Sequence, residues 1–243
     1  MRNPFAFSGS RRFFGALFCF SLCLMAGGAL AAKARPPSKD APQAKALSHD
    51  EGIVAYCFDG DSVKLTDRRV IRLAGIDAPE LPHDRRKVQY YAREARQELA
   101  RLAQGKKVRL VAVGRRGEKD SNGRMVADLR LENGQSLNAL MIRRGAAFFY
   151  SHKDQNADFQ KHLLELQRKA IAGRAGLWNR LFSLPLALNN YIGNRASSRF
   201  FPADCPEVRH IKPRNRVHFG TLMDAFLAGY APARICLFWP GVP

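Results

Sequence analysis

A short stretch of the sequence carries most of the side chains that could do chemistry. Within a segment that otherwise reads as β-strand, five charged residues stand out: Asp59, Asp61, Arg72, Asp77 and Glu80. Three further charged residues, at positions 67–69, read as the turn between two strands. The stretch predicts a strand–turn–strand hairpin, because Val63 and Leu65 alternate with polar residues and residues 70–76 form a second apolar run. Such a hairpin would bring Asp61 and Asp77 side by side. Because two close carboxylates repel each other, we expect a cation between them.

The expected cation is a hard one, calcium or magnesium, because its ligands are oxygens and no Cys or His pair lies nearby. Asp61 and Asp77 supply carboxylate oxygens, and the backbone carbonyl of Ala78 can add another ligand. Calcium takes about six to eight oxygens, so water and a substrate phosphate would complete the set, which suits catalysis better than a structural role. Glu80 lies near enough to hold a water without binding the metal, and Arg72 can grip a phosphate with a two-pronged hydrogen bond.

The surrounding sequence predicts the elements that must position these side chains. Besides the hairpin, alternating or apolar runs predict strands at residues 52–58, 107–113, 125–131 and 146–150. Apolar residues at helical spacing predict helices at residues 84–104, 137–144 and 159–170. This order fits an α+β, mainly β fold, a five-stranded Greek-key barrel of the OB type with about three helices.

Four short motifs follow one another along this half of the chain: Asp59-Gly60-Asp61-Ser62, Arg72-Leu73, Asp77-Ala78-Pro79-Glu80 and Asp120-Ser121-Asn122-Gly123-Arg124. In residue types, order and spacing, residues 52–178 resemble the staphylococcal nuclease (thermonuclease) family, and we place the corresponding domain at residues 51–179. The resemblance implies the OB-type barrel and a calcium-dependent nuclease that hydrolyses DNA and/or RNA, without saying which.

The resemblance also implies roles for individual residues. It implies that one calcium ion is held by Asp61, Asp77 and the carbonyl of Ala78. It implies that Glu80 is the general base or the group that orients the water. The remaining motif residues would be the phosphate clamps Arg72 and Arg124, and Asp59, which supports the metal without binding it.

Three positions depart from the family pattern. Ser62 stands for a threonine and keeps the hydroxyl, and Ala78 stands for a threonine whose backbone is what the metal uses. Asn122 stands where the best-known member has a nucleotide-contacting tyrosine, so the preference for a base or a terminal phosphate can differ. Tyr150 offers a ring for base stacking, or is a tyrosine at the edge of the core.

The composition points to a polyanionic partner. The 243 residues include 40 Lys and Arg against 21 Asp and Glu, for a formal charge of +19. Such a charge suits nucleic acid or an anionic surface. Two other functions stay open: a non-catalytic nucleic-acid-binding barrel of the OB type, and an adhesion protein. Both leave the full set of carboxylates unexplained, so we favour the nuclease, and expect a monomer.

The N-terminal segment reads as a targeting signal. Residues 1–32 combine Arg11 and Arg12 with a mostly apolar run and a small-residue end, so we expect a cleaved signal peptide and an exported protein, periplasmic or extracellular. Arg11-Arg12 resembles a twin-arginine signal, although the Sec route stays open, as does an uncut anchor. We expect no stable membrane association after cleavage. Residues 33–50 read as a disordered linker or, alternatively, a strand extension.

Residues 180–243 predict a small appended module. They resemble the zinc module of the methylphosphotriester-repair (Ada-type) proteins, whose four ligand positions here hold Phe201, Cys205, Ala233 and Cys236. Two thiolates cannot form a closed tetrahedral site, so we expect no zinc there. Given an exported protein, we hypothesise a Cys205–Cys236 disulfide in its place. The remaining thiol of the mature chain, Cys57, is expected to be buried.

Overall fold

The computed structural model describes residues 46–81, 88–114, 119–236 and 239–240, with side chains from residue 50 onward. The chain divides into two units, residues 1–41 and 42–243, and all described residues belong to the second. The predicted signal peptide and most of the predicted linker therefore lie outside the described residues. Among the described residues, none of the helices is long and apolar enough to cross a bilayer.

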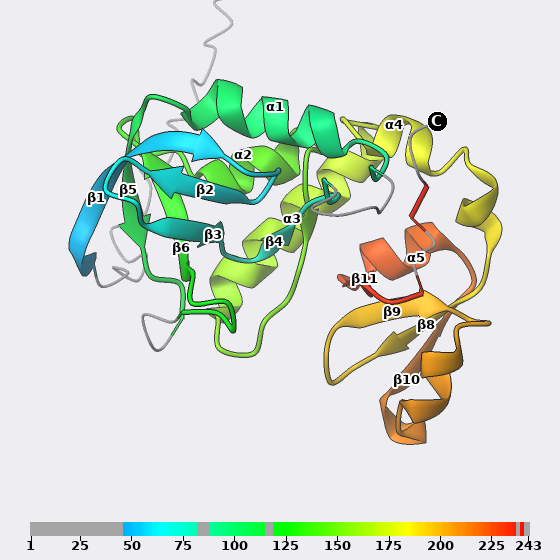
Figure 1. The fold of residues 1–243 in the computed structure, drawn as a ribbon. Coiled ribbons are helices and arrows are strands. Elements are labelled where there is room, and N and C mark those ends of the chain that lie inside the picture. Colours follow the sequence, from blue (N-terminus) through cyan, green and yellow to red (C-terminus); the bar gives the residue numbers. More distant parts are fainter. Residues whose placement is uncertain (1–45, 82–87, 115–118, 237–238, 241–243) are drawn as a thin grey trace, which may run out of the picture. The chain divides into compact units, whose positions relative to one another are not determined.

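Five strands close into a barrel in the order β1-β2-β3-β6-β5 (Figure 1). They are β1 (Ala46–Cys57), β2 (Ser62–Leu65), β3 (Val70–Leu73), β5 (Lys107–Val111) and β6 (Met125–Leu131). Four of the pairings are antiparallel, and β3 pairs with β6 in parallel. The predicted five-stranded barrel of the OB type is confirmed.

The barrel forms where polar and apolar residues alternate. In β2 only Lys64 is exposed, and in β5 Val108 and Leu110 are buried while Lys107 and Arg109 are exposed. Because successive side chains point to opposite faces of a strand, this alternation directs the apolar face of each strand toward the core. β1 begins at Ala46, earlier than the strand predicted at residues 52–58, and pairs with β5 there. The prediction of a disordered linker up to residue 50 is therefore wrong at its C-terminal end, where the alternative of a strand extension applies.

Three helices pack on the barrel and on one another: α1 (Ala92–Ala103), α2 (Leu137–Arg143) and α3 (Ala157–Ala172). Side-chain caps start the last two, since Ser136 and Asn156 each accept a hydrogen bond from a main-chain amide in the first turn. α1 begins well after the predicted start at residue 84. Tyr91, just before it, has a left-handed backbone (φ 68°), and residues 82–87 lie outside the described range.

Asp77 lies on a short two-stranded ribbon outside the barrel. β4 (Ile76–Asp77) pairs antiparallel with β7 (Phe148–Phe149), so the strand predicted at residues 146–150 is shorter than expected and does not belong to the barrel. Gly75 has a positive φ of 72°, which lets the chain turn out of β3 into β4. The ribbon therefore returns Asp77 to the end of the β2–β3 hairpin.

The C-terminal part forms a four-stranded sheet in the order β10-β8-β9-β11. Its strands are β8 (Tyr191–Asn194), β9 (Arg199–Pro202), β10 (Arg216–Phe219) and β11 (Ala231–Pro232). Its helices are α4 (Trp178–Leu181), α5 (Leu222–Leu227) and the 3-10 turns η1 (Pro185–Leu188), η2 (Pro206–His210) and η3 (Pro213–Asn215). The parallel pairing of β11 with β9 sets Ala231 opposite Arg199.

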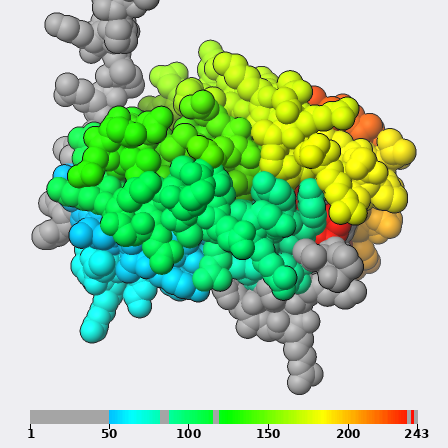
Figure 2. All heavy atoms as spheres, turned by 90° about the horizontal axis from the view of Figure 1, so that it is seen from above, coloured from blue at the N-terminus to red at the C-terminus, as the bar shows by residue number. Residues whose placement is uncertain are grey.

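One apolar core joins this sheet to the helices α3 and α4 that follow the barrel. Trp178 is buried, stacks on Phe182 and meets Phe226 edge-on with ring centroids 4.8 Å apart. Ile171 of α3 belongs to the same cluster. Among the described residues, apolar packing therefore continues across the boundary expected between residues 179 and 180. Figure 2 shows red C-terminal residues next to the segment that leads into α1, where Trp239 donates a hydrogen bond to the carbonyl of Tyr90.

A smaller cluster holds the two cysteines of the tail. Cys205 and Cys236, which are 31 residues apart in the sequence, form a disulfide. The other two positions of the resemblance, Phe201 and Ala233, belong to the same buried cluster. The four positions thus gather as an apolar and disulfide-bonded core. Cys57 is a free, buried thiol.

Candidate active site

The Asp59–Gly60 turn sets the direction of the next residue. One carboxylate oxygen of Asp59 accepts a hydrogen bond of 2.9 Å from the amide of Asp61. Gly60 packs so closely that an added Cβ would lie 2.7 Å from Cβ of Ala78 and 2.8 Å from Cβ of Ala95. Only glycine fits at such a separation, which explains the Asp-Gly-Asp pattern and ties the turn to α1.

Asp61 is held where the hairpin meets β4, and it is only 3% exposed. Its Oδ2 accepts the amide of Ala78 at 2.9 Å, and its Oδ1 accepts the hydroxyl of Ser62 at 2.8 Å. Its main-chain carbonyl accepts the amide of Leu73 at 2.8 Å. Ala78 thus contacts Asp61 through its main-chain amide. The sequence predicts a different role, in which the main-chain carbonyl of Ala78 binds the metal.

Arg72 bridges the two aspartates. Ser62 pairs with Arg72 across β2 and β3, so the arginine emerges beside Asp61. Its Nη1 lies 3.0 Å from Oδ1 of Asp61, and its Nη2 donates to Oδ1 of Asp77 at 2.8 Å. The expected phosphate clamp therefore lies between the two expected metal ligands.

Asp77 is surrounded by three guanidinium groups. Besides Arg72, Nη1 of Arg199 donates to its Oδ2 at 2.6 Å, and Nη2 of Arg234 donates to its Oδ1 at 2.8 Å. Burial disfavours the ionised carboxylate, but Arg199, Arg72 and Arg234 together outweigh it and hold the pKa of Asp77 well below its ordinary value. Asp77 is therefore firmly ionised.

The other two carboxylates are shifted the opposite way. Burial raises the pKa of Asp61 well above its ordinary value, since Arg72 only partly offsets the desolvation and the charges of Asp59 and Asp77 add to it. Burial also raises the pKa of Glu80, against the opposing charge of Arg234. Carboxylates with pKa values pushed apart in one cluster are typical of acid–base sites.

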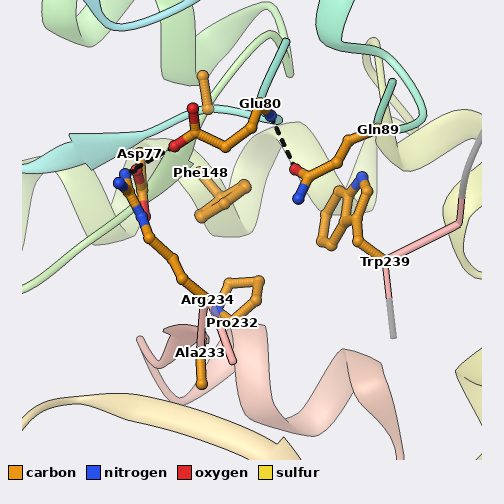
Figure 3. Close-up of a pocket in the computed structure, with 9 residues that line it drawn as sticks. Asp77, Glu80, Gln89, Phe148, Pro232, Ala233, Arg234 and Trp239 are labelled. Carbon is orange, nitrogen blue, oxygen red and sulfur yellow. Dashed lines mark hydrogen bonds and ion pairs between the residues drawn. The ribbon is translucent and has the colours of Figure 1, made fainter. Parts of the chain in front are cut away.

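Glu80 joins the cluster through the tail. Its Oε1 lies 2.8 Å from Nη2 of Arg234, the same nitrogen that contacts Asp77. Its amide donates to the side-chain oxygen of Gln89 at 2.7 Å. Figure 3 shows Arg234 reaching from the end of β11 toward both carboxylates, with Trp239 beside Gln89. A single nitrogen therefore supplies positive charge to two of the expected site residues.

Arg124 reaches the cluster through Ser62. The turn at residues 120–123 delivers it to β6, and Oδ2 of Asp120 accepts its Nε at 2.7 Å. Its Nη1 donates to the hydroxyl of Ser62 at 3.2 Å. Ser62 in turn donates to Asp61, so Arg124 is linked to the cluster through one hydroxyl.

Arg199 covers one face of the Tyr150 ring. The guanidinium carbon of Arg199 lies 3.6 Å from the centroid of its ring, a cation–π contact. The main-chain amide of Tyr150 donates to the carbonyl of Gly75 at 2.9 Å. A base can stack on that face only after Arg199 moves, so the stacking role expected for Tyr150 is restricted.

Two cavities adjoin the cluster. The larger, of about 500 Å³, is lined among others by Arg72, Arg124, Tyr150, Arg199 and Arg234. The smaller, of about 20 Å³, is enough for about one water molecule. Its walls are Asp77, Ala78 and Glu80 on one side and Pro232, Ala233, Arg234 and Trp239 on the other. The C-terminal residues thus cover the carboxylate side of the site.

The donor set fits a hard divalent ion. Asp61 and Asp77 are buried carboxylates with hard oxygen donors, the ligand class that calcium and magnesium prefer. The guanidinium nitrogen of Arg234 already provides positive charge between Asp77 and Glu80, in the way a cation would. Within the described residues, no three Cys, His, Asp or Glu side chains lie close enough together to hold an ion. Because guanidinium groups already occupy Oδ1 and Oδ2 of Asp77, an ion has to replace or rearrange these contacts.

Arg199 and Arg234 were not predicted as site residues. They lie 122 and 157 residues from Asp77 along the chain, and the resemblance around them pointed to a separate appended module. In a chain with 40 Lys and Arg residues, composition does not single them out. Only the pairing of β9 with β11, and their approach to β4, brings them to the site.

Known proteins resemble this chain over part of its length. The family described as "Staphylococcal nuclease homologue" matches residues 70–180. An "Uncharacterized endonuclease" of Escherichia coli O157:H7 is 33% identical over 137 residues, which cover 55% of this chain and 80% of that protein. "Endonuclease YhcR" of Bacillus subtilis is 27% identical over 205 residues, 74% of this chain but 16% of that protein.

A plant protein, "Probable staphylococcal-like nuclease CAN1" of rice, is 32% identical over 108 residues, 44% of this chain and 28% of that protein. The chain therefore spans only a small part of the Bacillus and rice proteins. The barrel and the ordered motifs agree with these matches. Because the chain covers 80% of an endonuclease-named relative that is 33% identical to it, it belongs to the staphylococcal nuclease homologue family.

Proposed function

We propose that this protein is a calcium-dependent nuclease that hydrolyses phosphodiester bonds of DNA and/or RNA with water. One observation carries the proposal: Asp61, Asp77 and Glu80 are linked to one another through the guanidinium groups of Arg72 and Arg234, beside a cavity of about 500 Å³. Acidic groups and phosphate-binding groups around one space are what phosphodiester hydrolysis requires.

The expected ligands of the calcium ion are Asp61, Asp77 and the carbonyl of Ala78. Once bound, the ion would draw negative charge from the phosphate and orient a water. Asp77 is buried and presents hard carboxylate oxygens, so it is suited to hold a cation once the guanidinium contacts have moved.

The side chains around the ion have distinct tasks. The carboxylate of Glu80 accepts a proton from the attacking water or aligns that water. Arg72 and Arg124 donate N–H groups to the phosphate oxygens and stabilise the extra negative charge of five-coordinate phosphorus. Arg124 has its Nη2 left for this role, because Nε bonds Asp120 and Nη1 bonds Ser62, and Nη2 has no hydrogen-bond partner within the described part of the chain.

The substrate class follows from the phosphate chemistry. Contacts to phosphate carry no information about sugar or sequence, so both DNA and RNA are candidates. The formal charge of +19 favours such polyanions. In keeping with residues 1–32, we also propose that the protein is exported, by the Sec or the twin-arginine route, and acts as a monomer. Fractionation of expressing cells and light scattering of the mature protein test these two points.

Digestion of supercoiled plasmid and of RNA by the mature protein tests the proposed function. The assay compares calcium with a chelator, and Asp61→Asn with the matched control Asp67→Asn, an exposed aspartate paired with Arg69. We expect the parent and the control to cut only with calcium, and Asp61→Asn to be nearly inactive. Nucleic acid that is bound but never cut would contradict the proposal and would favour a non-catalytic binding barrel.

A further inference from the structure

Two arginines of the C-terminal sheet enter the candidate active site. We propose that Arg199 and Arg234 bind substrate phosphates that neighbour the one being cleaved, so that the C-terminal sheet forms part of the nucleic-acid-binding surface. The inference rests on the proposed function, since it concerns the same site. It assigns substrate-binding residues outside the region that matches the family, residues 70–180.

Arg199 is preorganised. It begins β9, and its Nη1 donates to both Oδ2 of Asp77, at 2.6 Å, and the carbonyl of Pro232, at 2.8 Å. Its guanidinium plane is also held against the ring of Tyr150. Both hydrogen bonds use one nitrogen, so Nε and Nη2 have no hydrogen-bond partner among the described residues. A guanidinium fixed in place with donors to spare can bind a phosphate oxygen at a small entropic cost.

Arg234 is held from the neighbouring strand. It follows β11, which pairs in parallel with β9, so the two arginines come from neighbouring strands of the sheet. Its contacts with Asp77 and Glu80 both use Nη2, and its side chain is 54% exposed. The disulfide at Cys236, two residues later, anchors this segment to the sheet. Its Nη1 and Nε have no hydrogen-bond partner in the described part of the chain.

Both arginines line the larger cavity together with the two predicted phosphate clamps. Without an ion, the four guanidinium groups face five acidic side chains: Asp59, Asp61, Asp77, Glu80 and Asp120. A divalent cation would turn this small excess of negative charge into a small excess of positive charge. A phosphate of a nucleic-acid strand, with its one negative charge, would balance that excess. The charge of the site with an ion therefore suits a phosphodiester strand.

An opposite role for Arg234 is conceivable, that of a plug which keeps cations away from Asp77 and Glu80. The two roles predict opposite signs for its removal. A phosphate-binding arginine, once removed, weakens the binding of nucleic acid, whereas a removed plug raises calcium affinity and activity. The spare donors of both side chains and their shared cavity favour the first role.

The test uses the full mature chain and a fluorescent 12-nucleotide single-stranded DNA, with binding measured in chelator over a range of salt concentrations. It compares Arg199→Ala and Arg234→Ala with Arg195→Ala, an exposed arginine of the same β8–β9 hairpin that does not line the cavity. We expect each of the two variants to bind about tenfold more weakly. We also expect each to lower the slope of log affinity against log salt by about 0.7, the value for one lost phosphate contact. The control should lose less affinity and keep its slope.

Thermal unfolding shows whether each variant folds, and Arg199→Lys should keep the salt slope while losing affinity. The half-exposed Arg234 can be tested even if removal of Arg199 unfolds the chain. Parental affinity and slope in both alanine variants, or faster cleavage by Arg234→Ala in calcium, would overturn the inference. A parent that cuts DNA while the variants bind like the parent refutes this inference alone. A parent that neither binds nor cuts refutes the proposed function as well.

Discussion

At the scale of the residue, guanidinium groups dominate the site. Arg72 bridges Asp61 and Asp77, and Arg234 bridges Asp77 and Glu80. A buried carboxylate is costly without a partner, so these contacts keep the cluster folded without an ion. Removal of Arg72 would leave two buried aspartates with less compensation, which makes that variant a poor probe of catalysis alone.

Arg124 is a better probe, because it is only partly buried and pairs with Asp120 rather than with the two buried aspartates. Arg124→Ala should lower kcat/KM by about 10²- to 10³-fold, since it removes a donor to the transition-state charge. The free energy of unfolding should change by only about 1 kcal/mol, because the ion pair with Asp120 is partly solvated and is not part of the buried aspartate cluster. Steady-state cleavage and urea unfolding measure the two effects. The control is Arg101→Ala, which breaks the surface pair with Glu98; equal rates for both variants would remove Arg124 from the mechanism.

The buried thiol of Cys57 makes the free energy of unfolding depend on pH in the alkaline range. Burial raises the pKa of its thiol to about 12 from a model-compound value of 9.0. The folded state therefore favours the protonated thiol, and its stabilising effect is complete below about pH 9 and lost as the pH rises toward 12. The loss is about 1.4 kcal/mol per pH unit above about 9. Urea unfolding of the parent and Cys57→Ala should show their difference shrinking between pH 8 and pH 10. A difference that stays constant would contradict the buried, neutral thiol.

At the scale of the element, the hairpin and the β4 return bring together residues that are separate in sequence. The alternation around Val63 and the Asp-Gly turn were enough to predict the hairpin. The start of α1 was not predictable, because helical spacing continues through residues where Tyr91 takes a left-handed backbone. The pairing of β4 with β7 was also missed, since two-residue strands carry no periodic signal.

The turn before Asp61 can be tested through Gly60. Gly60→Ala would place a Cβ within 2.7 Å of Cβ of Ala78 and 2.8 Å of Cβ of Ala95, so the turn or α1 has to shift. We expect a loss of about 1–3 kcal/mol in the free energy of unfolding, the cost of overpacking, and a marked loss of activity because Asp61 moves. The control is Gly173→Ala, whose nearest neighbour would lie at 3.4 Å. Parental stability and activity in Gly60→Ala would show that the close packing is not required.

At the scale of the whole molecule, the residues from 42 onward form one unit, in which the barrel helices and the C-terminal sheet share a core. The motif half of the site was predictable from the sequence because its residues lie within one stretch. The other half was not, because Arg199 and Arg234 reach Asp77 only through the folding of a separate sheet. Trp178, just before the expected division after residue 179, packs against rings of the C-terminal part.

Truncation after residue 180 tests that shared core. It removes Phe182 and Phe226, the ring partners of Trp178, and exposes the apolar face of α3 and α4. Loss of large buried aromatic partners typically costs about 3–5 kcal/mol each. We expect a lower melting temperature and aggregation, measured by calorimetry and light scattering. The single substitution Phe226→Ala should lower the melting temperature in the same direction. A truncated chain that melts as high as the parent would mean that the barrel folds independently.

The most direct test of the central claim is the single-turnover cleavage of a labelled oligonucleotide as a function of calcium concentration, for the parent and Glu80→Gln. The account predicts a rate that saturates with calcium in the parent and falls by at least about 100-fold in Glu80→Gln, while binding of the oligonucleotide in chelator is similar. Equal cleavage rates for the two proteins, or undiminished cleavage by the parent in chelator, would contradict it.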